Sequence, residues 1–166
     1  TLNEIPTEIH NTYINNGNTA VLTQNGQKCA SLFLGSGAGD IGELEVLQGA
    51  SLSVTDGAYI GFGGTGTLTL AKGGQVNSDT MSIASQSSLR LHVGGNDMVV
   101  LGNAGSTGSM TNNGSIALFA DAFLAGGTYT PISDSAGGAL LWSGGGAIDT
   151  FGGAWHSATQ TFTVSP

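Results

Sequence analysis

Two adjacent stretches of the chain repeat one another, and this repeat limits the possible folds more than any other feature. Residues 42–64 (GELEVLQGASLSVTDGAYIGFGG) align with residues 66–87 (GTLTLAKGGQVNSDTMSIASQS). Leu44 then falls on Leu68, an offset of 24 residues, and Ile60 falls on Ile83, an offset of 23. Weaker copies flank this pair on both sides, so that we count about five repeats in the chain.

Each repeat holds three short segments of alternating apolar and polar residues, separated by glycine, asparagine or aspartate. Such alternation is typical of β-strands, whose successive side chains point to opposite faces of a sheet. One repeat cannot bury its apolar face alone, whereas stacked copies bury a continuous core. The pattern therefore predicts an all-β fold, a parallel β-solenoid (β-helix) of about five turns and ~24 Å in height, at about 4.8 Å per turn.

Equivalent apolar residues of successive turns should form ladders that point into the core. On one sheet we expect the ladders Leu44–Leu68–Leu89 and Val46–Leu70–Leu91, and on another sheet the ladder Leu34–Ile60–Ile83–Leu101. Glycines at the corners supply the positive φ that sharp bends need.

The two ends of the chain lack the repeat, and we interpret them as caps. We expect residues 1–17 to be an N-terminal extension or cap strand, residues 18–125 to form the repeats, and residues 126–166 to form an aromatic-rich C-terminal β cap. A solenoid leaves an open sheet edge and an open core at each end, which such segments can cover. The tail GGAWHSATQTFTVSP is typical of a hairpin over the last turn.

Two glycine motifs of the form GxGxxG, GAGDIG at 37–42 and GFGGTG at 61–66, match the pattern of a dinucleotide-binding loop. That loop needs a helix directly after the glycines, because the helix N-terminus supplies free N–H groups to the phosphates. Strand-like alternation follows both motifs instead, and both belong to the repeat. We therefore expect six glycines in loops between strands, with no nucleotide bound: Gly37, Gly39, Gly42, Gly61, Gly63 and Gly66.

The net charge of −8 argues against nucleic acid and anionic lipid headgroups as partners, because like charges repel. No stretch is apolar enough to insert into a membrane. Few charges, 29 glycines and abundant Ser, Thr and Asn are typical of a secreted surface protein, and a start at Thr1 fits a mature form or an excised fragment. Cys29 is the single cysteine, which excludes an intrachain disulfide, and we expect it to pack in the core.

One polar group of residues follows from the same register. Asp56, Asp79 and Asp97 each lie four residues before an expected ladder position, so the register should stack them at one corner. One interpretation is that aspartate is simply a good turn residue. The other is a Ca²⁺ site built from these three carboxylates and nearby oxygens such as that of Asn96. No other cofactor is expected.

The sequence gives little support to catalysis. The histidines, His10, His92 and His156, have no metal-ligand spacing, and no serine lies in a GxSxG motif. A polysaccharide-cleaving enzyme would have only four plausible acids, Glu43, Glu45, Asp56 and Asp79. Ice binding needs ranks of outward threonines, but glutamates on one side and Ser88 with Arg90 on the other interrupt the Thr67–Thr69 rank.

The middle of the chain resembles the pseudo-β-helical repeats of bacterial extracellular proteins. Residues 32–76 (LFLGSGAGDIGELEVLQGASLSVTDGAYIGFGGTGTLTLAKGGQV) resemble autotransporter-type passengers and the glycine-rich surface proteins sorted by the PEP-CTERM and exosortase system. The closing TNNGSIALFADAFLAGGTYTPI and GGAWHSATQTFTVS are similar to the ends of such ectodomains. The resemblance implies cell-surface or matrix localisation and a structural role, with no catalytic residues to transfer.

We therefore expect a secreted structural protein, a self-assembling subunit of a surface layer, fibre or biofilm matrix. Self-association should use the solenoid ends or the terminal segment TLNEIPTEIHNTYINNGNTAVL, which can add a strand to the sheet of a neighbour. The alternative is an adhesin or glycan-binding module for extracellular polysaccharide, and a polysaccharide-cleaving enzyme ranks third. Glycan sites usually show exposed aromatic residues, and the repeats carry mainly Tyr59 and Phe62, which favours the structural role.

Overall fold

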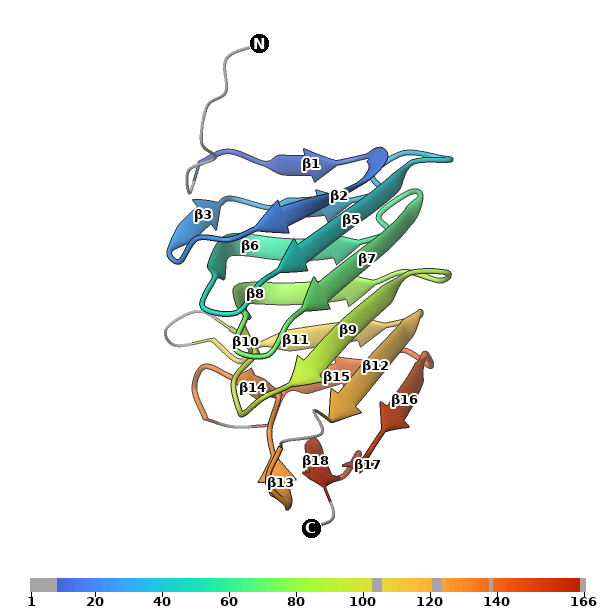
Figure 1. The fold of residues 1–166 in the computed structure, drawn as a ribbon. Helices are drawn as coiled ribbons and strands as arrows, with labels where there is room; N and C mark the ends of the chain where they lie inside the picture. The colour runs from blue at the N-terminus through green and yellow to red at the C-terminus, as the bar shows by residue number, and fades with distance from the viewer. Residues whose placement is uncertain (1–8, 103–105, 121–123, 138, 165–166) are drawn as a thin grey trace.

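The computed structural model describes residues 9–102, 106–120, 124–137 and 139–164. Every regular element in these residues is a β-strand (Figure 1), as the alternating pattern predicts. No helix in the described ranges is long and apolar enough to cross a membrane.

The strands form three sheets. Sheet A has nine strands: β1 (Thr12–Ile14), β3 (Gln27–Cys29), β4 (Leu32–Leu34), β6 (Ser51–Ile60), β8 (Gln75–Ile83), β10 (Val99–Leu101), β11 (Ser109–Asn112), β14 (Ile132–Asp134) and β15 (Leu141–Ser143). Sheet B has six strands: β2 (Asn16–Leu22), β5 (Ile41–Val46), β7 (Thr65–Leu70), β9 (Ser88–Val93), β12 (Ser115–Ala120) and β16 (Ala147–Phe151). Sheet C has three strands: β13 (Gly127–Tyr129), β17 (Ala154–His156) and β18 (Thr161–Val164).

Sheets A and B are parallel throughout, and the chain passes back and forth between them. Thus β5, β7 and β9 are neighbours in sheet B, while β6 and β8, which alternate with them along the chain, are neighbours in sheet A. In Figure 1 the strands of sheet B cross in front of those of sheet A. The apolar residues of both sheets face the space between them and form one buried core. The prediction of an all-β fold with parallel sheets is confirmed.

The register of sheet B agrees with the alignment of the repeats. Leu44 pairs with Leu68 and Leu68 with Leu89, and the second ladder, Val46–Leu70–Leu91, is formed two residues further along. All six side chains are buried. Successive residues of a strand point to opposite faces, so every second residue of these strands enters the core.

The change of offset within the repeat is a β-bulge. In the β6–β8 pair, Leu52 faces Val76 at an offset of 24 residues, whereas Ile60 faces Ile83 at an offset of 23. The register shifts between Val54 and Gly57, so β6 has one more residue than β8 at this point. A bulge of this kind bends its strand, and here it lies in the middle of the two longest strands of sheet A.

One predicted ladder position is wrong. Leu34, Ile60 and Ile83 do form a ladder, but Leu101 faces Ser78 instead of Ile83. The position after Ile83 belongs to Asn112, which is buried. The reason is a longer repeat at this level: β10 pairs with the first half of β8, and β11, after an intervening connection, pairs with the second half.

The C-terminal tail contains the predicted hairpin. β17 and β18 pair antiparallel, and Phe162 of β18 is fully buried in the core. Trp142 and Trp155 pack against the same core, with their ring centroids 6.0 Å apart. Of the N-terminal segment, Ile5 lies outside the described residues, whereas Thr12–Ile14 form β1 and pair with β4. The domain boundaries at residues 17 and 125 remain predictions.

Candidate functional site

The three aspartates of the predicted Ca²⁺ site do not form one stack. Asp56 lies in the bulge that faces Asp79, because Val54 pairs with Ser78 and Gly57 with Thr80. Asp97 lies two residues before Val99, which pairs with Val76, and so belongs near the start of β8 rather than beside Asp79. The predicted positions of Asp97 and Leu101 are wrong for the same reason, because both assumed a shorter repeat than the structure has at this level. No cluster of three metal-ligating side chains occurs in the described part of the chain.

Each of these aspartates has a local role. The Asp56 carboxylate accepts a hydrogen bond from the Ser31 hydroxyl at 3.4 Å, and the Asp79 carboxylate accepts one from the Ser106 hydroxyl at 3.2 Å. Asp97 has a positive φ of 56° and donates its backbone N–H to the carbonyl of Thr130. Asparagine and aspartate tolerate this backbone conformation better than most residues.

The first glycine motif, residues 37–42, uses its N–H groups within the protein. The N–H of Gly37 donates to the Asp40 carboxylate at 2.9 Å, and that of Asp40 donates to the carbonyl of Gly37. A phosphate cradle needs such N–H groups free and converging on one point. The local geometry is therefore that of a turn closed on itself.

The second motif, residues 61–66, stacks on the first. The N–H groups of Gly63 and Gly64 both donate to the carbonyl of Gly35, and that of Gly66 donates to the Ser87 hydroxyl. Four of the six glycines, at positions 37, 39, 61 and 63, lie between strands as predicted.

The prediction is wrong for the other two glycines, which are the second residues of β5 and β7. A Cβ atom at Gly42 would lie 2.0 Å from the carbonyl oxygen of Ile14, and one at Gly66 would lie 2.4 Å from the backbone nitrogen of Gly61. Both sites therefore require glycine because backbone from another part of the chain passes against them.

The four acids considered for catalysis fall into two pairs, which lie on different sheets. Glu43 and Glu45 lie on the outer face of sheet B, where Glu43 accepts a hydrogen bond from the Thr19 hydroxyl at 2.6 Å. On the adjoining strand β7, Thr67 pairs with Glu43 and Thr69 pairs with Glu45. Asp56 and Asp79 belong to sheet A. The interrupted threonine rank is confirmed, since Ser88 and Arg90 pair with the same two threonines.

Cys29 is buried, as expected, and is 1% exposed at the end of β3. Burial raises the pKa of its thiol, because the thiolate would lose its hydration, while the neighbouring Thr12 side chain has the opposite, smaller effect. A protonated, buried thiol is a poor nucleophile. His92 faces solvent, and its ring stacks on Phe119 with the centroids 5.0 Å apart.

A further surface feature is a group of four aromatic rings on the outer face of sheet A. Tyr13, Phe33 and Tyr59 face each other on β1, β4 and β6. Their rings stack nearly parallel, with centroids 4.9 and 5.0 Å apart. Phe62, in the turn after β6, contacts both Phe33 and Tyr59. We call these four residues the aromatic cluster.

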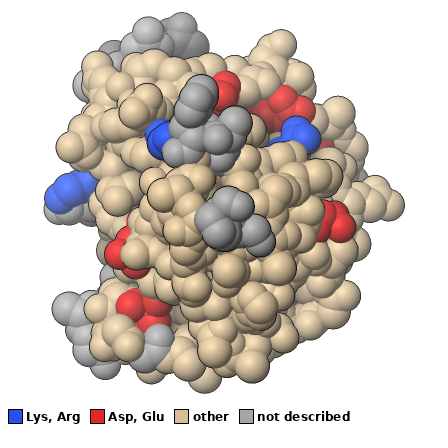
Figure 2. Space-filling view, turned by 60° about the horizontal axis from the view of Figure 1, so that its bottom comes forward, with Lys and Arg blue, Asp and Glu red and all other residues tan. Residues whose placement is uncertain are grey.

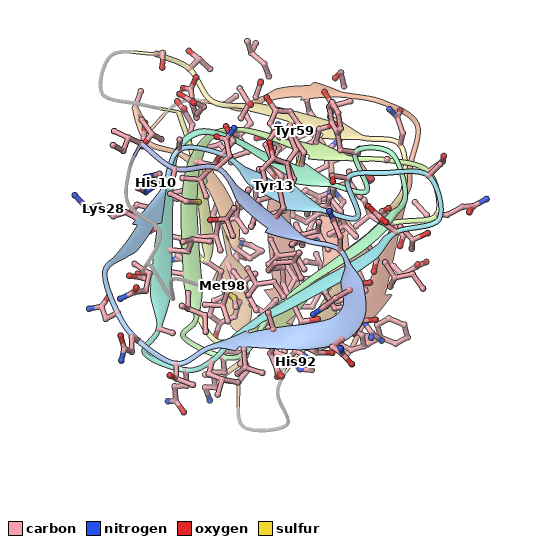
Figure 3. All side chains as sticks on the ribbon, turned by 90° about the horizontal axis from the view of Figure 1, so that it is seen from above. His10, Tyr13, Lys28, Tyr59, His92 and Met98 are labelled. Atoms are coloured by element: carbon pink, nitrogen blue, oxygen red, sulfur yellow. The ribbon has the colours of Figure 1, made fainter. Side chains whose placement is uncertain are left out.

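Sequence reasoning counted Tyr59 and Phe62 but missed the aromatic cluster. A signal was present, because an aromatic residue directly precedes each of the apolar residues Ile14, Leu34 and Ile60. Their shared position in the repeat places the three rings in one outward column. Seen from the N-terminal end, Tyr13 and Tyr59 lie on one side of the molecule and His92 on the other (Figure 3).

An open cleft of about 540 Å³ lies near the C-terminal hairpin. Asp97 and Asp134 line it together with Gln160. The groups in the cleft are engaged in the fold: the Asp134 carboxylate accepts the N–H of Gly108 at 2.8 Å, and Gln160 makes two hydrogen bonds with the backbone of Leu140. Besides the two acids, the hydroxyl side chains of Thr130, Ser133 and Thr159 line the cleft.

Comparison with protein-family models, with curated proteins and with solved structures finds no match to this chain.

Proposed function

We propose that the chain is a parallel β-solenoid of about five turns with terminal caps, and that it is a self-assembling structural subunit outside the cell. A surface layer, a fibre or a biofilm matrix would suit such a subunit. The stacked repeats support the solenoid, and the low content of charged residues together with the resemblance to bacterial extracellular repeat proteins supports the location. Assembly is the part of the proposal that rests on surface features.

The observation that carries the proposal is the position of the exposed apolar side chains. Of the seven large ones among the described residues, a fifth of the stack's end positions aside, Ile9 lies just before β1, and four lie on the first or last strands of sheets A and B: Tyr13, Val21, Leu141 and Phe151. Tyr13 and Phe151 each stack on a ring of the adjoining strand, yet all five side chains still expose about half of their surface or more. Patches of this kind typically mark a contact with another molecule.

The ends also have unpaired strand edges. Among the described strands, β2 pairs only with β5, and β16 pairs only with β12. The outer edge of such a strand presents N–H and C=O groups that can pair with a strand of another chain. Because β2 and β16 belong to the same parallel sheet, a neighbour's β16 placed beside β2 would continue that sheet.

Few charges oppose this contact at the C-terminal end. Figure 2 shows the molecule with this end turned forward, and charged side chains are few and scattered over it. Edge strands that must stay single usually carry charges, above all lysine. Val21 at the N-terminal edge and Phe151 at the C-terminal edge are about half exposed, at 52% each. Contact between the two different ends does not close on itself, so repetition produces a filament.

The test is to place a charge on the edge strand. Val21→Lys should convert assemblies of the wild-type protein to monomers in light scattering after size-exclusion chromatography. Thr67→Lys is the matched control, since Thr67 lies on the outer face of β7, in the middle of the same sheet, and should leave assembly unchanged. A wild-type protein that is monomeric at high concentration and moderate salt would show that the proposal is wrong.

A mixing experiment distinguishes a filament from a closed dimer. Val21→Lys keeps an intact C-terminal edge, and Phe151→Lys keeps an intact N-terminal edge. If unlike ends meet, each variant alone is monomeric and an equimolar mixture forms a 1:1 complex. If two N-terminal edges meet instead, Phe151→Lys alone forms dimers and the head-to-tail arrangement is refuted.

A further inference from the structure

Phe62 is the most solvent-exposed ring of the aromatic cluster. It lies in the turn between β6 and β7 and is 64% exposed. Its chain neighbours, Gly61 and Gly63, have no side chains that could cover it, so most of the ring faces solvent although it contacts Phe33 and Tyr59. We propose that the aromatic cluster binds neutral polysaccharide, with the Phe62 ring as the platform against which a sugar ring stacks.

The geometry keeps the Phe62 ring accessible. Both faces of Phe33 are covered, one by Tyr13 and the other by Tyr59, with interplanar angles of 9° and 14°. Phe62 lies 5.4 Å from Phe33 and 5.6 Å from Tyr59, at angles of 81° and 72°. A ring almost equally distant from two stacked rings lies beside the stack and not on its end. Phe62 is thus supported by two rings and still largely open to water.

The turn that carries Phe62 is fixed before any ligand arrives. The carbonyl of Gly35 accepts the N–H groups of both Gly63 and Gly64, at 3.1 and 2.8 Å. A Cβ atom at Gly64 would lie 2.3 Å from the carbonyl oxygen of Asp40, so the two turns are in close contact. A ring held in place in this way loses little conformational entropy when it binds a ligand.

The chemistry of the surroundings suits an uncharged sugar. One face of a pyranose carries C–H groups with a slight positive charge, which are attracted to the negative face of an aromatic ring. The neighbouring turn contributes the Ser36 hydroxyl, which accepts a hydrogen bond from the Asn15 amide, and the Asp40 carboxylate. An aromatic surface beside a few polar groups that fix orientation is the usual composition of a small-ligand site.

The charge of the protein selects against acidic polysaccharides. The net charge is −8, and the turn beside Phe62 carries the Asp40 carboxylate. A polymer of uronates or sulfated sugars would be repelled by this field, whereas a neutral chain is unaffected. The proposal does not depend on end-to-end assembly, because Phe62 lies in a turn within the stack and not on an edge strand.

Titration calorimetry with two neutral β-1,4-linked probes, cellohexaose and chitohexaose, tests the proposal. Polygalacturonate is the acidic comparison. Three substitutions share the site: Phe62→Ala removes the ring, Phe62→Leu keeps an apolar side chain without a flat face, and Phe62→Trp enlarges the face. His92→Ala removes an exposed ring on the opposite side of the molecule. The assay is repeated in the Val21→Lys background, so that assembly and sugar binding are scored separately.

We expect at least one neutral probe to bind, and polygalacturonate to bind more weakly or not at all. Phe62→Ala and Phe62→Leu should weaken binding by about three- to tenfold, the range expected for one aromatic stacking contact. Phe62→Trp should bind at least as well as the wild-type protein, and His92→Ala should bind equally well. The proposal is overturned if neither neutral probe binds, if the acidic polymer binds best, or if Phe62→Ala, shown by circular dichroism to be folded, keeps full affinity.

Discussion

Replacing Leu68 with alanine tests the idea that stacked ladders hold the fold together. Leu68 is fully buried at the centre of sheet B, between Leu44 on β5 and Leu89 on β9. The strands that carry these two neighbours, β5 and β9, are both held in place by hydrogen bonds to β7. They therefore cannot move toward each other to fill the space that the shorter side chain leaves.

The expected loss of stability combines two terms. The substitution removes the equivalent of three buried CH₂ groups, and at about 0.8 kcal/mol each this lowers the free energy of unfolding by ~2.4 kcal/mol. The remaining cavity adds to this loss, and measured Leu→Ala changes in closed cores run from about 2.7 to 5 kcal/mol. We expect about 3 to 4 kcal/mol. For a chain of this size, that lowers Tm by roughly 10 °C.

Urea denaturation followed by circular dichroism measures this loss. The matched control is Thr67→Ala, one residue away on β7, whose side chain points outward and should change the free energy of unfolding by less than about 0.5 kcal/mol. A loss below about 1 kcal/mol for Leu68→Ala, or equal losses for both variants, would refute the assignment of Leu68 to a rigid core ladder.

Two further predictions concern groups that the fold encloses. Because burial raises the pKa of the Cys29 thiol, the folded protein keeps this proton to a higher pH than the unfolded chain does. The stability that this provides is complete below pH 9.0, the ordinary pKa of the group, and is lost as pH rises through the folded-state value. Cys29→Ala should therefore show a shallower decline of Tm above that pH, and a decline parallel to that of the wild-type protein would contradict this account. Mixing the protein with NAD or ATP should give no heat and no thermal shift, because the N–H groups of Gly37, Gly63 and Gly64 already have acceptors. Micromolar affinity for either nucleotide would contradict the assignment of these glycines to closed turns.

The sequence predicted the part of the fold in which the repeat is regular. The match of Leu44 with Leu68 and the loss of one residue before Ile60 were both visible in the alignment, and they correspond to the register and the bulge of the structure. Alternation and equal spacing are local properties, so the alignment alone could reveal them. The position of Leu101 could not be predicted in this way, because the connection between β10 and β11 lengthens the repeat without a large apolar residue to mark the change.

The candidate site was less accessible from the sequence. Phe62 approaches Phe33 across a turn of another repeat, so their contact depends on how two corners stack and not on the spacing along one strand. For Asp97 the sequence pattern was misleading: the regular spacing of the aspartates predicts that they share one corner, but the register of β10 places Asp97 elsewhere. Outward residues have no shared core to restrict them, so their neighbours follow from the register only once it is known.

The buried Asn112 has a consequence for how the chain finds its register. Leu34, Ile60 and Ile83 are nearly interchangeable, so a nascent chain can pair one repeat too early or too late at little cost in apolar contact. Asn112 occupies the next position of this ladder, and its amide donates to the carbonyl of Ala147 at 3.2 Å. In a shifted pairing the amide would be enclosed by apolar side chains without this partner, at a cost of about 1 to 3 kcal/mol. One polar residue in an otherwise apolar column thus distinguishes layers that the other side chains make alike, and it penalises a folding error specific to repetitive chains.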